Sequence, residues 1–129
     1  MGKRYLIDSN VIIDYTALRL PEKGSDFVEN LFDTDFLISV ATKIEVLGFN
    51  DVPEKLVAME EFVNSATTLS LDELVTNQTI ALRREYKKLK LGDAIIAATA
   101  LVHNLIVISR NVSDFKNITG LEVIDPHSL

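Results

Sequence analysis

The sequence predicts an α/β fold: a three-layer α/β/α domain built on a central, mostly parallel, five-stranded sheet. Short apolar runs alternate with longer segments whose apolar residues recur at helical spacing. Unbroken runs of Val, Ile and Leu are typical of strands buried on both faces, and strands that alternate with helices form parallel sheets. The predicted strands are residues 4–8, 36–40, 67–71, 105–109 and 121–125.

The segments between the first three strands predict four helices. Residues 10–18 form the first, and Ser25 can act as the N-cap of a short second helix that ends at the turn of residues 33–35. A third helix over residues 41–49 follows the second strand. Pro53 can then stand in the first turn of a fourth, where its missing N–H costs nothing.

Two more helices follow the third strand. Ser70 and Glu73 have the spacing of a capping box, in which each side chain accepts a hydrogen bond from the other's backbone. They open a long helix that Gly92 ends. Residues 93–103 are apolar almost all round, so the last helix is predicted to be buried.

Composition limits the class of protein. The 129 residues, 47% of them hydrophobic, suit a single domain over residues 1–129. The chain has no cysteine, which excludes disulfides and thiolate metal sites. It shows neither a signal-type N-terminus nor an apolar run of membrane-spanning length, so we expect a cytoplasmic protein with no membrane partner.

Four acidic residues stand at comparable places, near the end of a predicted strand or the start of the next helix: Asp8, Glu45, Asp93 and Asp114. Each has a structural alternative. Asp8 could be a helix N-cap, and Glu45 could form a capping box with Thr42. Asp93 could be an acid favoured by the helix dipole, and Asp114 could be a turn residue. Together they would converge on one rim of the sheet, where carboxylates repel unless a cation neutralises them. Oxygen-only ligands suit Mg²⁺ or Mn²⁺.

Basic residues are concentrated in one stretch, although the net charge is −6. This negative net charge argues weakly against a nucleic-acid partner, because affinity for phosphates comes largely from Lys and Arg. RREYKKLK, residues 83–90, nevertheless holds five of the thirteen basic residues. Arg84, Lys87 and Lys88 are candidates for RNA binding, and a solvated outer helix face is the alternative.

Four stretches carry a family resemblance that spans nearly the whole chain. They are LIDSNVIIDY, TKIEVLGF, KLKLGDAIIAATALVHNLIVIS and SRNVSDF. Together they resemble PIN-domain ribonucleases, and most closely the VapC-type toxins of toxin–antitoxin pairs. The resemblance implies an endoribonuclease that requires Mg²⁺ or Mn²⁺ and leaves 5′-phosphate and 3′-hydroxyl ends. It also implies an RNA substrate, a VapB-like antitoxin partner and a homodimer.

The resemblance further assigns roles to residues. The catalytic and metal-binding set is Asp8, Glu45, Asp93 and Asp114, and the supporting residues are Asn10 and Ser109. The chain departs from the family at Gly92, where relatives often have Pro, and at Ser109, where Thr is more usual. Some relatives carry another acid at residues 110–112, where this chain has no carboxylate. Whether the site binds a second metal ion is therefore left open.

Other functions remain alternatives at this point. One is a housekeeping RNA-processing nuclease of the same family, and another is a catalytically silent module that binds RNA or protein. A phosphorylated receiver-like domain would need an Asp at the end of the third strand, where the chain has Ser70 and Leu71. Asp14 is interpreted as a helix-surface acid, with a residue that supports the acidic site as the alternative. His103 and His127 lack the spacing of metal ligands.

Overall fold

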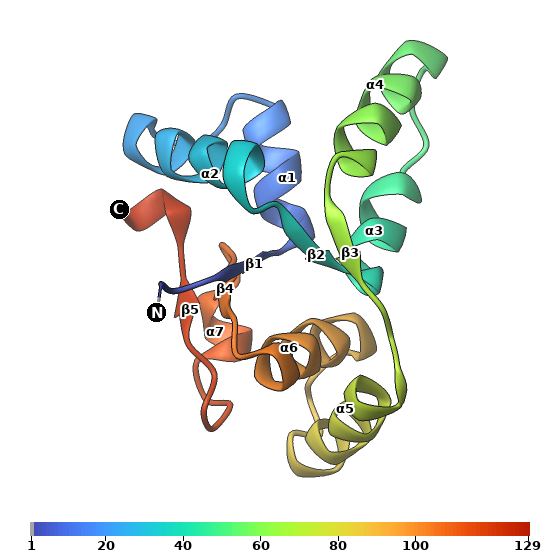
Figure 1. Cartoon of the computed structure of the whole chain (residues 1–129), viewed down its shortest axis with the longest axis vertical. Coiled ribbons are helices and arrows are strands. Elements are labelled where there is room, and N and C mark those ends of the chain that lie inside the picture. The colour runs from blue at the N-terminus through green and yellow to red at the C-terminus, as the bar shows by residue number, and fades with distance from the viewer. Residues whose placement is uncertain (1) are drawn as a thin grey trace.

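Parallel strands alternate with helices in the computed structural model, which describes residues 2–129 (Figure 1). The elements in chain order are β1 (Tyr5–Ile7), α1 (Ser9–Thr16), α2 (Glu22–Thr34), β2 (Leu37–Ser39), α3 (Val40–Leu47), α4 (Pro53–Asn64), β3 (Thr67–Leu69), α5 (Glu73–Glu85), α6 (Leu91–His103), β4 (Ile106–Ile108), α7 (Val112–Phe115), β5 (Val123–Ile124) and the short 3₁₀ helix η1 (Pro126–Ser128). All five predicted strands are present, each shorter than predicted. The sequence did not predict α7 or η1.

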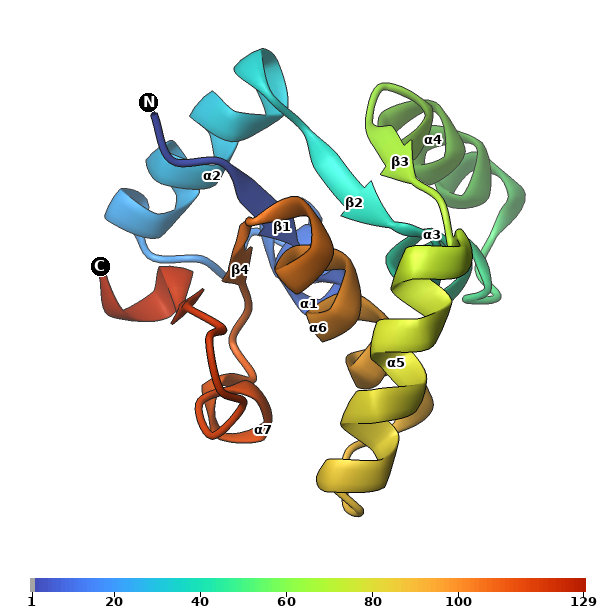
Figure 2. The ribbon, with the colours of Figure 1, turned by 60° about the horizontal axis from the view of Figure 1, so that its bottom comes forward.

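The strands run parallel but form two hydrogen-bonded groups. β4 lies between β1 and β5, while β2 pairs with β3 alone. β1 and β2 still lie side by side (Figure 2), which gives the spatial order β3-β2-β1-β4-β5. The predicted five-stranded parallel sheet is therefore divided into three and two strands. In this order the topology reverses at β1, so the crevice that favours ligands lies at the carboxyl ends of β1 and β4.

Successive residues of the central strands face opposite layers, which confirms the predicted three-layer arrangement. Leu6 and Val107 join the hydrophobic cluster under α5 and α6, while Ile7 and Ile108 join the cluster under α1 and α2. Figure 1 shows these two pairs of helices on opposite sides of the strands. Burial on both faces explains why the strands are continuous apolar runs.

The start of α3 differs from the prediction. Ser39 is its N-cap, and the Ser39 hydroxyl accepts a hydrogen bond from the backbone N–H of Thr42 at 3.1 Å. The structural alternative for Glu45, a capping box with Thr42, is therefore not formed. The side chain of Glu45 is not engaged at the helix start and is available to the crevice.

The predicted capping box of α5 is wrong. Asp72 caps this helix by accepting from the backbone N–H three residues further on, and Ser70 and Glu73 do not form the expected pair. α5 ends at Glu85, well before Gly92, and residues 86–90 form a non-helical connection to α6.

α2 is longer than predicted at both ends. It begins at Glu22, before the expected N-cap Ser25, and continues through Thr34. Gly24 lies inside this helix, where a Cβ would stand 1.9 Å from the carbonyl oxygen of Pro126. The glycine therefore allows η1 to pack directly against α2.

No helix among residues 2–129 has the length and apolar character needed to cross a membrane.

Candidate active site

Asp8 lies at the carboxyl end of β1 and is only 3% exposed. It is the N-cap of α1, and its Oδ1 accepts from the backbone N–H of Ser9 at 2.7 Å. Its Oδ2 accepts from the hydroxyl of Ser109 at 2.8 Å and from the carboxamide of Asn10 at 3.1 Å. Burial raises the pKa of Asp8, and these hydrogen bonds oppose the shift. The capping alternative thus holds for Asp8, and the same carboxylate also faces the crevice.

Asn10 and Ser109 form a neutral cradle for this carboxylate. Besides its bond to Asp8, the Asn10 carboxamide donates to the Ser109 hydroxyl at 3.0 Å. That hydroxyl also accepts from the backbone N–H of Asn111 at 2.9 Å. The structure therefore places both predicted supporting residues against Asp8, and each is held by further hydrogen bonds.

Glu45 reaches the same place from α3. The Ser9 hydroxyl lies 3.3 Å from Glu45 Oε2 and 3.3 Å from Asp8 Oδ1, so it stands between the two carboxylates. A Cβ added at Gly92 would lie 3.3 Å from Glu45 Oε1. The first turn of α6 therefore passes close to the Glu45 carboxylate. Burial, followed by the charge of Asp8, raises the pKa of Glu45.

Asp93 lies in the first turn of α6 and is half-buried. Burial, followed by the charges of Asp8, Asp114 and Glu45, raises its pKa to about 6, while the charge of Lys90 opposes the shift. A carboxyl group perturbed by three others is typical of carboxylates that share one site. The fold therefore brings together acids that are far apart in the sequence.

Asp114 completes the group from α7. It is exposed, and its Oδ2 accepts from the side chain of Asn111. The sequence did not indicate a role for Asn111, because α7 was not predicted and the contacts of this side chain depend on the turn between β4 and α7. In the structure it contacts both Asp114 and the Ser109 hydroxyl, so it links the outermost acid to the cradle of Asp8.

The donor set fits a hard divalent cation. Within residues 2–129, none of the four candidate acids belongs to an ion pair. Carboxylates held only by neutral donors retain charge that an oxygen-seeking cation can offset. Among these residues no three His, Cys, Asp or Glu side chains already converge as a closed ligand group.

A polar hollow of about 510 Å³ extends away from this acidic edge. Its lining includes two of the candidate acids, Asp93 and Asp114, and three lysines, Lys87, Lys88 and Lys90. It thus joins the basic connection between α5 and α6 to the candidate acids.

The three candidate RNA-binding residues therefore differ in position. Lys87 and Lys88 are exposed and line the hollow, whereas Arg84 lies on α5 and is not part of the lining. Neighbouring Arg83 has a structural contact, since its guanidinium donates to the carbonyl of Leu89 at 2.8 Å. That bond fixes the shape of the connection that carries the lysines.

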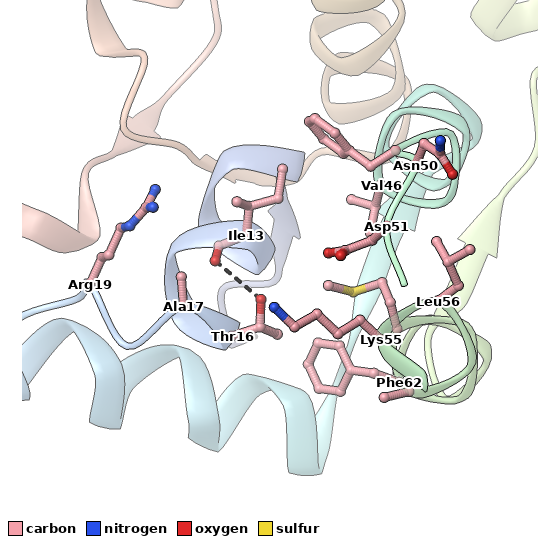
Figure 3. Close-up of a pocket in the computed structure, with 13 residues that line it drawn as sticks. Ile13, Thr16, Ala17, Arg19, Val46, Asn50, Asp51, Lys55, Leu56 and Phe62 are labelled. Atoms are coloured by element: carbon pink, nitrogen blue, oxygen red, sulfur yellow. Dashed lines mark hydrogen bonds between the residues drawn. The ribbon is translucent and has the colours of Figure 1, made fainter. Parts of the chain in front are cut away.

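A second hollow of about 570 Å³ lies between α1, α3 and α4 (Figure 3). Ile13, Val46 and Phe62 contribute apolar surface to it, and Phe49 and Leu56 are partly exposed at 59% and 36%. None of the candidate acids lines it. It is therefore separate from the candidate acids.

The prediction that Asp14 is a helix-surface acid is wrong. Asp14 is 1% exposed, and it accepts from the Arg110 guanidinium at 2.8 Å and lies 2.9 Å from Nε2 of His127. The partners of Asp14 lie far away along the chain, so no local pattern indicates them. His103 is exposed.

Comparison with known proteins identifies the family. The PIN-domain family model matches residues 5–121. Ribonuclease VapC1 of Rickettsia felis is 29% identical, with 92% of this chain and 93% of that protein covered. A toxin–antitoxin complex from Klebsiella pneumoniae contains a chain that is 30% identical, with a TM-score of 0.77 and coverage of 95% of this chain and 97% of that one. A chain of DNA-bound VapBC from Salmonella typhimurium has the same fold, with a TM-score of 0.79 at 24% identity and coverage of 97% and 99%. This chain therefore belongs to the PIN-domain family, and its relatives group it with the VapC-type members of that family.

Proposed function

We propose that this chain is a Mg²⁺- or Mn²⁺-dependent endoribonuclease, the toxin of a VapBC-type toxin–antitoxin pair. The observation that carries the proposal is the buried Asp8 carboxylate, which is held by neutral donors beside Glu45 and Asp93. Such an arrangement is costly for a purely structural role, because repulsion between acids destabilises the folded chain. A function that needs a cation at this place accounts for that cost.

The residues that would hold the ion are Asp8, Glu45, Asp93 and Asp114, directly or through water. When bound, a divalent ion lowers the pKa of a coordinated water and offsets charge on a phosphodiester in its transition state. Asn10, Ser9 and Ser109 fix the orientation of Asp8.

The chain's own residues also indicate how RNA would lie. Lys87, Lys88 and Lys90 border the hollow that leads to Asp93 and Asp114. Ammonium groups along a groove attract phosphates without reading sequence. We assign this hollow to the RNA backbone beside the scissile bond, with the lysines holding the phosphates and the carboxylates standing at the reacting one.

A protein partner is the second part of the proposal. The similar chain from Klebsiella pneumoniae is part of a toxin–antitoxin complex. In this chain the hollow between α1, α3 and α4 leaves Phe49 and Leu56 partly exposed over an apolar floor. We assign it to an apolar segment of an antitoxin. An Arg of the same partner would suit the acidic edge, where it could pair with carboxylates in place of the metal. A homodimer is proposed on the family resemblance alone.

Expression in bacteria tests the toxin role. The wild-type chain should arrest growth, whereas Glu45→Gln at the same expression level should not, and co-expression of the neighbouring antitoxin should restore growth. If the wild-type chain is as harmless as Glu45→Gln in a host that contains the target RNA, the toxin proposal fails. A housekeeping nuclease of the same family would then be favoured, provided that RNA cleavage persists in vitro.

A further inference from the structure

A buried ionic network lies behind the candidate acids without belonging to them. The carboxylate of Asp14 on α1 is almost fully buried, and NH1 of Arg110 donates to its two oxygens at 3.0 and 2.8 Å. His127 Nε2 lies 2.9 Å from Oδ2 of the same carboxylate. The side chains of Arg110 and His127 are 55% and 28% exposed, so the network reaches from the interior to the surface.

We infer that Asp14, Arg110 and His127 are positioning residues for the acidic site, an inference that rests on the proposed nuclease function. The connection runs through a single residue. The guanidinium of Arg110 is fixed by Asp14, and the backbone N–H of Arg110 donates to Oδ1 of Asn10 at 3.0 Å. With its oxygen held, the Asn10 carboxamide directs its nitrogen to Asp8 and Ser109.

Helical spacing explains why one residue can make both contacts. Asn10 and Asp14 are four residues apart on α1, so their side chains lie on the same face of the helix. Arg110 follows the carboxyl end of β4 and spans this face, with its backbone at Asn10 and its side chain at Asp14. The segment after β4 is thus joined to α1 at Asn10 and at Asp14. Asp8 and Ser109 both contact the side chain of Asn10.

The 3₁₀ helix η1 supplies the second partner of Asp14, His127. Asp125 caps η1 by accepting from the backbone N–H of His127 at 2.8 Å. Pro126 packs against Gly24 of α2, where no side chain would fit. These contacts fix the backbone that carries His127, and they direct its ring onto the Asp14 carboxylate.

A role in positioning explains why the network is ionic. An ion pair between a buried carboxylate and a largely exposed guanidinium gives little net stability, because Asp14 loses its hydration while water still screens the charge of Arg110. A network whose polar atoms are all satisfied does restrict geometry, since each group has a single favourable orientation. No buried side-chain nitrogen or oxygen within residues 2–129 lacks a partner. The network therefore specifies the placement of Asn10 more than it stabilises the fold.

Two measurements that do not depend on RNA cleavage test this inference. The first is NMR of the metal-free protein, which follows hydrogen exchange of the Asn10 side-chain amide. The second is the Mn²⁺ affinity by calorimetry. In Arg110→Ala and His127→Ala, exchange should become faster and the Mn²⁺ affinity should fall by about tenfold, as for other residues that support metal ligands. Arg4→Ala is the matched control, because it removes an Arg–Asp pair, with Asp35, that does not contact the site.

A double-mutant cycle separates positioning from general stabilisation. Once Asn10→Ala has removed the carboxamide, adding Arg110→Ala should reduce the Mn²⁺ affinity no further. Additive losses, or losses equal to that of Arg4→Ala, would overturn the inference. Arg110→Ala and His127→Ala test the inference even if Asp14→Asn does not fold, because these two side chains are more exposed. Absence of RNA cleavage by the wild-type protein would refute the proposed function but would leave both measurements interpretable.

Discussion

The hydroxyl of Ser109 donates to Oδ2 of Asp8 at 2.8 Å, although the two residues are 101 positions apart in the sequence. They follow neighbouring parallel strands, β4 and β1, at the point where the strand order reverses. The hydrogen bond therefore joins the carboxyl ends of the two strands, with the carboxylate following β1 and its donor following β4.

Replacement of this donor should weaken the site. In Ser109→Ala, Asp8 loses one hydrogen bond and the backbone N–H of Asn111 loses its acceptor. We expect a loss of about 1–3 kcal/mol in the free energy of unfolding and a weaker Mn²⁺ affinity. Ser109→Thr keeps the hydroxyl and should behave almost as the wild type. Urea unfolding and calorimetry measure both effects, and equal behaviour of the two variants would contradict this role of the hydroxyl.

The raised pKa of Asp93 predicts how stability depends on pH without metal. Its pKa is 3.8 in the unfolded reference and about 6 in the folded chain, so the folded state binds more protons between these values. Stability from this group is therefore fully present below pH 3.8 and is lost as the pH rises through about 6. Because Asp93 is only half-buried, we expect a change of about 1 kcal/mol.

Thermal unfolding in EDTA at a series of pH values on both sides of this window measures the dependence, with Asp93→Asn as the comparison. The difference in stability between the two proteins should favour the Asp93→Asn variant only at the upper end of the pH series, where the wild-type carboxyl is charged. A difference that does not vary with pH would show that Asp93 has an ordinary pKa.

The lysines beside the hollow should contribute to RNA affinity. The double variant Lys87→Ala, Lys88→Ala should weaken RNA binding and reduce the slope of log K against log salt concentration by roughly 0.7 for each phosphate that is no longer neutralised. Arg84→Ala is the matched control, since Arg84 lies outside the lining. Fluorescence anisotropy at several salt concentrations makes the comparison. If the control changes the slope as much as the double variant does, the hollow is not the path of the RNA.

The apolar hollow predicts a separable partner surface. Phe49→Asp should reduce co-purification with the antitoxin, because a charge would enter an apolar contact. RNA cleavage by the free chain should be unaffected, since none of the candidate acids lines this hollow. Normal capture of the antitoxin by Phe49→Asp would place the partner elsewhere.

The sequence predicted β1, β2 and β4 well because they are largely buried and lie in continuous apolar runs. It predicted helix starts less well, since Ser39 and Asp72 cap the helices where Thr42 and Ser70 were equally plausible from composition alone. The division of the sheet into three and two strands depends on strand spacing, which no residue pattern encodes.

Family motifs indicated the candidate acids, and the structure brings them to one edge of the sheet. What the sequence could not show was the environment of Asp14, because its partners lie 96 and 113 residues away. An acid on an amphipathic helix is usually solvated, and only the packing of η1 and the segment after β4 makes this one buried. Asn111 was missed for a similar reason, since its contacts with Ser109 and Asp114 require the turn between β4 and α7.

Cleavage of RNA by the purified chain tests the central claim most directly. Wild-type protein should cut RNA with exposed single-stranded loops in Mn²⁺ or Mg²⁺, and EDTA should stop the reaction. Asp93→Asn should be inactive while its circular dichroism spectrum and cooperative unfolding remain those of a folded chain. Cleavage that persists in EDTA and in Asp93→Asn would contradict the account, because it would show that neither the carboxylates nor a divalent ion is required.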